Sequence, residues 1–357
     1  MFRIKNLPAH FLTAITPGHR FRPKAEYGRV AEQVLVLNRS GSSSIEIYIR
    51  PRLLNSRLPI TYVDFPDCQP GPEYFTKNTF VIISRYINYR WYMALKRNRD
   101  KLAGVAYLMD DNIPEAGFDH TLPPVYALGL AHFFYKYWKR LQGICSELWV
   151  SSPNLFERYH SPVTHRLDPL FISKSRKENT ANGYTTIFYH AQRPHYQDNL
   201  WLRDVVNHIQ HHYEHTVFET FGGDKVKQAY TNIPRSRVLS RFNWEGYLDY
   251  CSCLNYDIGL APINSGIFNQ ARSINKLFDI SRCGGAGIYT DTEPYSTVID
   301  SWKTGVLCEH NKEAWIEAIS ELIENESLRK SIYNNCVDFC ENHNKQAATP
   351  DSLKALM

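Results

Sequence analysis

The sequence lacks the features that place a chain in or across a membrane. Its 357 residues contain no run of 18 consecutive apolar residues, so nothing predicts a transmembrane helix. The first residues carry the charges of Arg3 and Lys5 but no apolar stretch after them, so we expect no signal peptide. These absences predict a cytoplasmic protein, and they leave peripheral contact with the inner face of the membrane open.

Cysteine pairs with the spacing of a zinc site are also missing. None of the eight cysteines forms a CxxC motif, and two close pairs, Cys251 with Cys253 and Cys336 with Cys340, lack a second half. Several cysteines lie in apolar runs, where the free side chain packs as a small hydrophobic group. We therefore expect reduced thiols and no metal site.

The excess of positive charge is small. The net charge of +5 and the isoelectric point near 8.6 are mildly basic, and no nucleic-acid-binding motif accompanies them, so we expect no nucleic-acid partner. Basic residues do gather near the N-terminus, where they form either a solvated face or a patch for anionic lipid or an acidic polymer. They are Arg3, Lys5, His19, Arg20, Arg22, Lys24 and Arg29.

Short apolar segments alternate with helical stretches along the whole chain, which is typical of a mostly parallel α/β sheet. Hydrophobic residues make up 43% of the chain, enough for a core in each of two domains. The predicted strands are 45–49, 60–63, 80–84, 104–109, 148–150, 184–189, 217–221, 237–242, 257–261 and 286–290. The predicted helices are 89–101, 125–141, one capped by Ser152, then 198–213, 245–254, 271–283, 313–325 and 327–341.

A polar, non-periodic segment, 173–183, is the best candidate for a linker between two α/β halves. It predicts an N-terminal domain over 1–172 and a C-terminal domain from 184 to 335, facing a cleft. Open α/β sheets bind ligands at the carboxyl ends of their strands, so we expect a site where the motifs below follow strands.

The segment 256–284, YDIGLAPINSGIFNQARSINKLFDISRCG, contains the most informative of these motifs. It predicts a strand, a loop with Gly266, and a helix that starts with Arg272, Ser273 and Lys276. Two cations and a hydroxyl at a helix N-terminus suit a phosphate. Asp279, one turn further, suits sugar hydroxyls, and together these residues predict a nucleotide-sugar site. The alternative is an ordinary helix with charged residues on its surface.

Other polar residues follow predicted strands. Asp110 and Asp111 end a buried strand and are candidates to orient or deprotonate an acceptor hydroxyl, or they form a turn. His190 and His195 follow another strand, and imidazole suits proton transfer at neutral pH. Arg193, between them, is a candidate phosphate clamp.

Two further positions are weaker candidates for the donor site. Gly222 lets the backbone approach a ligand closely, or it belongs to a turn. Trp244 is a candidate contact for the base, or it is a core residue.

The segment 256–295 resembles the C-terminal signature of glycosyltransferases with the GT-B fold, most of all family 4-like enzymes of bacterial surface polysaccharide synthesis. The shared elements are D-I-G-L-A-P at 257–262, F-N at 268–269, A-R-S-x-x-K at 271–276, an acidic residue at 279, Gly-Gly at 284–285 and D-x-x-P-Y at 291–295. Weaker similarities extend the resemblance over roughly 80–335. Two positions depart from the family's E-x7-E motif: Ala271 stands where the family has the first glutamate, and Asp279 is shorter than the glutamate usually found at the second.

The resemblance implies two Rossmann-like domains, with the last helix, 336–357, packing back on the first domain. It implies that Arg272 and Lys276 contact the donor diphosphate and that Asp279 contacts the ribose or the sugar. The expected activity is metal-independent transfer of a sugar from a nucleoside diphosphate or CMP to a lipid-linked or polysaccharide acceptor, without another cofactor. Two alternatives stay open: a nucleotide-sugar epimerase on the same fold, and a non-catalytic sugar- or polymer-binding subunit of a glycan assembly complex.

Overall fold

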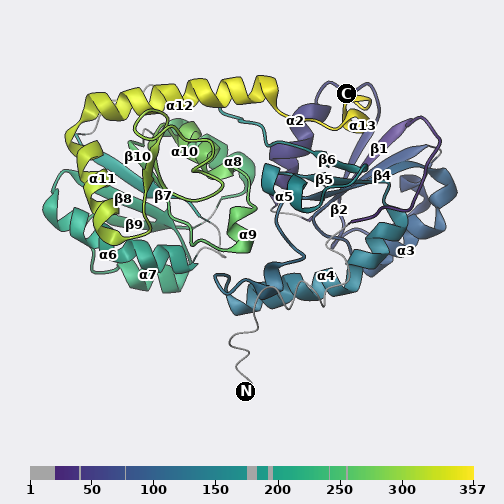
Figure 1. The fold of residues 1–357 in the computed structure, drawn as a ribbon, viewed down its shortest axis with the longest axis horizontal. Coiled ribbons are helices and arrows are strands. Elements are labelled where there is room, and N and C mark those ends of the chain that lie inside the picture. Colours follow the sequence, from purple (N-terminus) through teal and green to yellow (C-terminus); the bar gives the residue numbers. More distant parts are fainter. Residues whose placement is uncertain are drawn as a thin grey trace, which may run out of the picture. The chain divides into compact units, whose positions relative to one another are not determined.

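The computed structural model describes residues 21–39, 42–76, 78–174, 183–191, 196–240, 242–254 and 256–357. The chain divides into two compact units (Figure 1). The first unit contains Met1–Asp168 and Ala348–Met357, and the second contains Pro169–Ala347.

The first unit is built on a parallel six-stranded sheet with the order β2-β1-β3-β4-β5-β6. Its central strands β3 and β4 are buried at every residue, as expected for a parallel sheet covered on both faces. The strands are β1 (Gln33–Asn38), β2 (Ile60–Asp64), β3 (Thr79–Ser84), β4 (Leu102–Met109), β5 (Glu147–Val150) and β6 (Thr164–Arg166). The α-helices are α2 (Arg50–Leu53), α3 (Tyr89–Arg97), α4 (Pro124–Ile144), α5 (Pro153–Arg158) and α13 (Asp351–Lys354).

The second unit is also built on a parallel six-stranded sheet, with the order β12-β11-β10-β7-β8-β9. Strands β7 and β10 are neighbours although two other strands separate them in sequence. The strands are β7 (Thr185–Tyr189), β8 (Thr216–Phe221), β9 (Ser236–Leu239), β10 (Ile258–Ala261), β11 (Ala286–Thr290) and β12 (Val306–Cys308).

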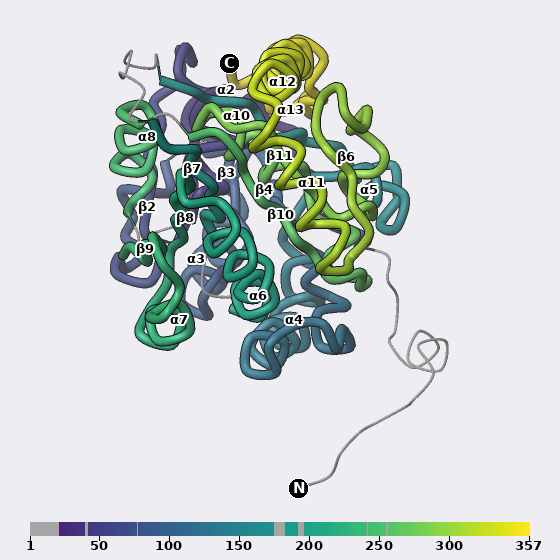
Figure 2. The backbone as a smooth tube through the Cα atoms, turned by 90° about the vertical axis from the view of Figure 1, so that its left-hand side faces the viewer, coloured from purple at the N-terminus to yellow at the C-terminus, as the bar shows by residue number. Residues whose placement is uncertain are grey.

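Helices cover both faces of this second sheet. On one face pack α6 (Tyr196–His212), α7 (Asp224–Tyr230) and α11 (Lys312–Glu324), with α6 and α11 side by side (Figure 2). On the other face lie α8 (Trp244–Cys253), α10 (Asn275–Cys283) and much of α12 (Glu326–Gln346). The short helix α9 (Ile267–Gln270) precedes α10. No helix in the described ranges combines the length and apolar character needed to cross a membrane.

Most predicted elements are confirmed with shifted ends, but the predicted strand 45–49 is wrong. This segment forms a helix, η1 (Ile45–Ile49), that continues into α2. Its β-branched residues are typical of strands, but here they lie in a helix in which every side chain except that of Glu46 is buried. An ion pair of 2.8 Å between Arg50 and Glu46, one turn apart, supports the helix. Strands β1, β6 and β12 and helices α2, α7 and α9 were not predicted.

The boundaries of the units differ from the predicted domain boundaries. The first division lies between Asp168 and Pro169, and most of the predicted linker, 175–182, falls outside the described residues. The predicted C-terminal segment 336–357 is not one helix, because α12 starts earlier and stays in the second unit. Only the chain from Ala348 onward belongs to the first unit, where Ala348 and Asp168 exchange hydrogen bonds of 3.0 and 2.9 Å.

Candidate functional site

The order of the strands in the second unit creates a topological switch point. The chain proceeds from β7 to β8 on one side, whereas β10 leads to β11 on the other. In open α/β sheets the crevice for a ligand lies outside the carboxyl ends of two such strands. Here those ends are followed by His190 after β7 and by Pro262 after β10, and α9 and α10 come next in the chain.

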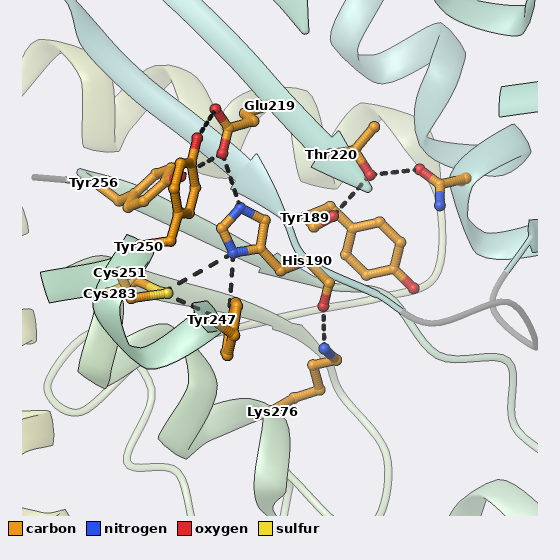
Figure 3. Close-up of polar contacts among 11 residues, drawn as sticks. Tyr189, His190, Glu219, Thr220, Tyr247, Tyr250, Cys251, Tyr256, Lys276 and Cys283 are labelled. Carbon is orange, nitrogen blue, oxygen red and sulfur yellow. Dashed lines mark hydrogen bonds and ion pairs between the residues drawn. The ribbon is translucent and has the colours of Figure 1, made fainter. Parts of the chain in front are cut away.

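Lys276 lies at this switch point. Its ammonium group donates to the main-chain carbonyl of His190, directly after β7 (Figure 3). The side chain is about one-fifth exposed and its Nζ is 3.3 Å from Asp279 Oδ2. Lys276 is the second residue of α10, so its charge is held between a helix N-terminus and the end of a central strand.

Arg272 and Ser273 precede α10 rather than lying in it, because the predicted helix 271–283 begins only at Asn275. Both residues are partly exposed in the turn between α9 and α10. The Arg272 guanidinium lies 5.3 Å from the centre of the Phe268 ring. Burial raises the pKa of the Tyr295 hydroxyl, and the nearby positive charge of Arg272 opposes that rise. Arg272 therefore lies close to the end of the D-x-x-P-Y segment.

Asp279 lies between two cations on one side of α10. Besides Lys276, it pairs with Arg282, whose Nη1 is 3.6 Å from Asp279 Oδ1. The Arg282 guanidinium also lies 4.8 Å from the centre of the Trp244 ring, and its side chain is only 2% exposed. Trp244, at the start of α8, is thus joined to the predicted donor residues through Arg282. Sequence reasoning missed Arg282, although its spacing of three residues from Asp279 was a usable signal.

The His190 side chain points into the unit and not toward solvent. Its ring stacks on Phe221 at 4.3 Å, and its Nε2 lies 3.1 Å from Glu219. Burial lowers the pKa of His190, but hydrogen bonds with Cys283 and Glu219 outweigh burial and leave it above the ordinary value. With 2% exposure, the ring is placed for packing and internal hydrogen bonding, while the His190 carbonyl faces Lys276.

Three other predicted site residues are Arg193, His195 and Gly222. Arg193 and His195 lie outside the described residues, so their roles stay predictions. Gly222 follows β8, and a Cβ atom built on it would lie 2.4 Å from the Cβ of Val226 in α7. The missing side chain at Gly222 therefore lets α7 pack against the end of β8.

In the first unit, Asp110 and Asp111 share one cation. Asp110 Oδ1 is 2.9 Å from Arg85 Nε, and Asp111 pairs with the same guanidinium. Ser44 donates to the other oxygen of Asp110, and Ser151 donates to its main-chain carbonyl at 3.1 Å. Arg85 directly follows β3 and the two aspartates follow β4, so neighbouring strand ends bring the three together. Sequence reasoning did not find Arg85.

The chain was compared with protein families, curated proteins and solved structures. No family model and no curated protein matches it. Among solved structures, a glycosyltransferase from Rickettsia africae is similar over 92% of this chain and 96% of its own, with 11% identity and a TM-score of 0.57. Sucrose-phosphate synthase from Thermosynechococcus elongatus is similar over 87% of this chain and 94% of its own, with 10% identity and a TM-score of 0.59.

A third similar structure is TarM from S. aureus, in complex with fondaparinux, alpha-GlcNAc-glycerol and UDP. It is 11% identical with a TM-score of 0.56, and 78% of this chain covers 55% of TarM, so the chain spans about half the length of that protein. At these identities the similarity shows the fold. The chain has the α/β fold of the GT-B glycosyltransferases, with one Rossmann-like domain in each unit.

Proposed function

We propose that this protein transfers a sugar from a nucleotide-activated donor to an acceptor in glycan synthesis. The observation that carries the proposal is the position of Lys276, whose ammonium donates to the His190 carbonyl at the carboxyl end of β7. This is the switch point of a Rossmann-like sheet, where a bound anion is expected. The fold shared with GT-B glycosyltransferases supports the same activity.

The donor is assigned to the second unit. Its phosphates would bind Arg272, Ser273 and Lys276, because two cations and a hydroxyl near the start of α10 suit a diphosphate. Asp279 would bind the ribose or the sugar through its hydroxyls. Arg282 and Trp244 would hold Asp279 and the start of α8 in place, since Arg282 contacts both.

The chemistry is a substitution at the anomeric carbon. The bond from this carbon to the phosphate oxygen breaks, and its electron pair leaves with the nucleotide. A bond to the acceptor oxygen forms, and the acceptor hydroxyl gives up its proton. Fixed cations stabilise the departing phosphate and positioning supplies much of the acceleration, so we assign no metal to this step. Asp110 and Asp111 remain our candidates for accepting the proton.

Helix α4 favours a lipid-linked acceptor over a free polysaccharide. Three of its large apolar side chains, Val125, Leu128 and Tyr135, are 86%, 69% and 67% exposed. Exposed Lys136 and Lys139 follow on the same helix. An exposed apolar stripe with adjacent lysines is typical of a helix that lies in the surface of an anionic membrane. We therefore propose peripheral contact between the first unit and the membrane that holds the acceptor.

Donor binding tests the proposal directly. Wild-type protein is first screened by thermal shift against UDP, GDP, CMP and dTDP sugars; saturation at 100 times Kd adds about 2.7 kcal/mol. Calorimetry with the best donor then compares wild type with Lys276→Ala. We expect affinity to fall by ~1.5–3 kcal/mol, roughly ten- to one-hundred-fold. Lys330→Ala, which removes an exposed lysine of α12, is the control. Equal affinity in all three proteins contradicts the site.

Turnover separates the activity from its alternatives. An epimerase would convert the donor sugar without any acceptor, and a binding subunit would hold the donor without transfer or hydrolysis. A transferase whose base is Asp111 loses rate in Asp111→Asn while its donor affinity stays the same. Unchanged function in that variant favours the binding subunit, for which Ala271 in place of a glutamate is the supporting observation.

A further inference from the structure

A group of reactive side chains lies inside the second unit, behind the end of β7. Its members are His190, Cys251 in α8 and Cys283 at the end of α10, all of them buried (Figure 3). One imidazole nitrogen and two sulfurs of these residues lie within 4.8 Å of one another. The sugar transfer proposed above uses none of these three side chains.

Glu219 fixes which imidazole nitrogen faces the sulfurs. His190 Nε2 is 3.1 Å from Glu219 Oε1, and a carboxylate only accepts, so Nε2 carries a hydrogen. The same carboxylate accepts from Tyr250 at 2.9 Å and from Tyr256, which holds it in place (Figure 3). Histidines that ligate metals commonly donate their other ring nitrogen to a carboxylate in this way.

The opposite nitrogen, Nδ1, faces the thiols. It lies 3.4 Å from the Tyr247 hydroxyl and 4.0 Å from Cys283 Sγ. The Tyr247 hydroxyl is 3.6 Å from Cys283 Sγ. The two sulfurs, Cys251 Sγ and Cys283 Sγ, are 2.7 Å apart. The Nδ1 nitrogen of His190 and the sulfurs of Cys251 and Cys283 thus surround one point, and the Tyr247 hydroxyl lies beside that point.

We propose that His190 Nδ1, Cys251 Sγ and Cys283 Sγ bind one zinc ion. Thiolate and imidazole ligands select zinc over magnesium and calcium, which prefer oxygen. In tetrahedral zinc, with bonds of about 2.3 Å to sulfur and 2.0 Å to nitrogen, neighbouring ligand atoms are roughly 3.3–3.8 Å apart. The 4.0 Å from Nδ1 to Cys283 is close to this range, and the two sulfurs separate by about 1 Å on binding.

The Tyr247 hydroxyl, which lies beside Nδ1 and Cys283 Sγ, is placed to be the fourth ligand that a structural zinc ion needs. Two thiolates neutralise the dication and the imidazole is neutral, so the ion and these three ligands carry no net charge, while the hydrogen bonds from His190, Tyr250 and Tyr256 stabilise the charge of Glu219. The rings of Phe221 and Phe188, 4.3 and 4.7 Å from the imidazole, keep water away. The ion would join the end of β7 to α8 and α10, and α10 carries Lys276. It would therefore stiffen the predicted donor site without contacting the donor.

The test uses the full chain, purified with a thiol reductant and without an affinity metal or chelator. Elemental analysis is expected to find about one zinc ion per chain. A chelator is expected to remove this zinc, and the stripped protein is expected to melt at a lower temperature. Stripped wild-type protein titrated with Co²⁺ is expected to develop the strong visible bands of tetrahedral cobalt with thiolate ligands. This spectrum needs no variant, so it reports on the site even where a substitution prevents folding.

Matched cysteine variants locate the ion. Cys251→Ser and Cys283→Ser are expected to lose most of the zinc and the cobalt–thiolate absorption. Two control variants are expected to keep the zinc and the cobalt absorption. Cys253→Ser replaces an exposed thiol in α8, the helix of Cys251, and Cys336→Ser replaces a buried thiol in the second unit.

Three results would overturn the proposal. The first is folded wild-type protein that holds no zinc and gives no tetrahedral cobalt spectrum. The second is zinc that the Cys283→Ser variant retains. The third is a Cys251–Cys283 disulfide, found by peptide mapping in protein that binds no metal. None of these results depends on whether the protein transfers sugar.

Discussion

The Arg282 guanidinium lies over the Trp244 ring, 4.8 Å from its centre, while its Nη1 is 3.6 Å from Asp279. One buried cation thus connects the start of α8 to the charged side of α10. Because a desolvated cation over an aromatic face is attracted to it, Trp244 does more than fill space.

Replacing Trp244 by leucine is therefore expected to destabilise the second unit by about 1–2 kcal/mol, since Arg282 loses its aromatic cover. Trp244→Phe keeps an aromatic face and is expected to lose less. Urea denaturation of the three proteins measures the difference. If phenylalanine and leucine cost the same, the lost contact area explains the effect and the cation–aromatic contact does not.

Asp279→Asn separates the two roles that Asp279 can have. The carboxylate pairs with Lys276 and Arg282, so its neutralisation leaves both cations more available to phosphate. We expect the bare nucleoside diphosphate to bind as tightly or several-fold more tightly. The complete nucleotide sugar is expected to bind more weakly, because an amide accepts hydroxyl hydrogen bonds less strongly than a carboxylate. Calorimetry with both ligands decides, and a parallel change in both affinities excludes contact with the sugar, because both ligands carry the ribose.

Gly222 and Gly223 offer a direct test of packing. Gly222→Ala places a methyl group 2.4 Å from Val226 Cβ, so we expect a loss of about 1–3 kcal/mol of stability. Gly223→Ala, where an added Cβ meets no atom beyond its chain neighbours within 4 Å, is expected to cost less, about 1 kcal/mol or below, because glycine is a better N-cap of α7 than alanine. Adding Val226→Ala to Gly222→Ala removes the two Cγ contacts at 2.7 and 2.8 Å but leaves the Cβ contact, so we expect it to restore only part of the lost stability. Thermal unfolding of these three variants and of wild type would contradict the packing role if the two glycine substitutions behaved alike.

Membrane contact through α4 is tested with two valines of equal exposure. Val125 on α4 and Val30, in the segment before β1 of the same unit, are both 86% exposed. Val125→Glu is expected to reduce co-sedimentation with anionic vesicles several-fold, because a carboxylate there opposes both insertion and the surface charge. Val30→Glu is the control and is expected to bind like wild type. Equal loss in both variants, or equal binding to uncharged vesicles, contradicts an α4 docking face.

Local patterns predicted much of the fold. Buried apolar runs located both central pairs of strands, and Ser152 was confirmed as the cap of α5, where its side chain accepts from Leu155 N. The segment 45–49 failed because β-branched residues dominate it, while the ion pair that holds it helical lies partly outside it. The short strands β6 and β12, of three residues each, carry too little pattern to be found.

The charged residues of the candidate site were predictable only where they are close in sequence. Lys276 and Asp279 share a helical face, and their ion pair follows from that spacing. Arg85 was missed because only the pairing of β3 with β4 brings it to Asp110. Cys251 and Cys283 lie in different helices, so a search for closely spaced cysteines does not find the pair.

The hydrogen bonds between Asp168 and Ala348 have a consequence for how this chain is put together. The polypeptide enters the second unit just after Asp168 and leaves it just before Ala348. The second unit is therefore formed by one continuous stretch of chain, and hydrogen bonds join the residues that precede and follow it. The first unit, by contrast, takes residues from both sides of the second unit, so during synthesis it is completed only after the whole second unit has been made.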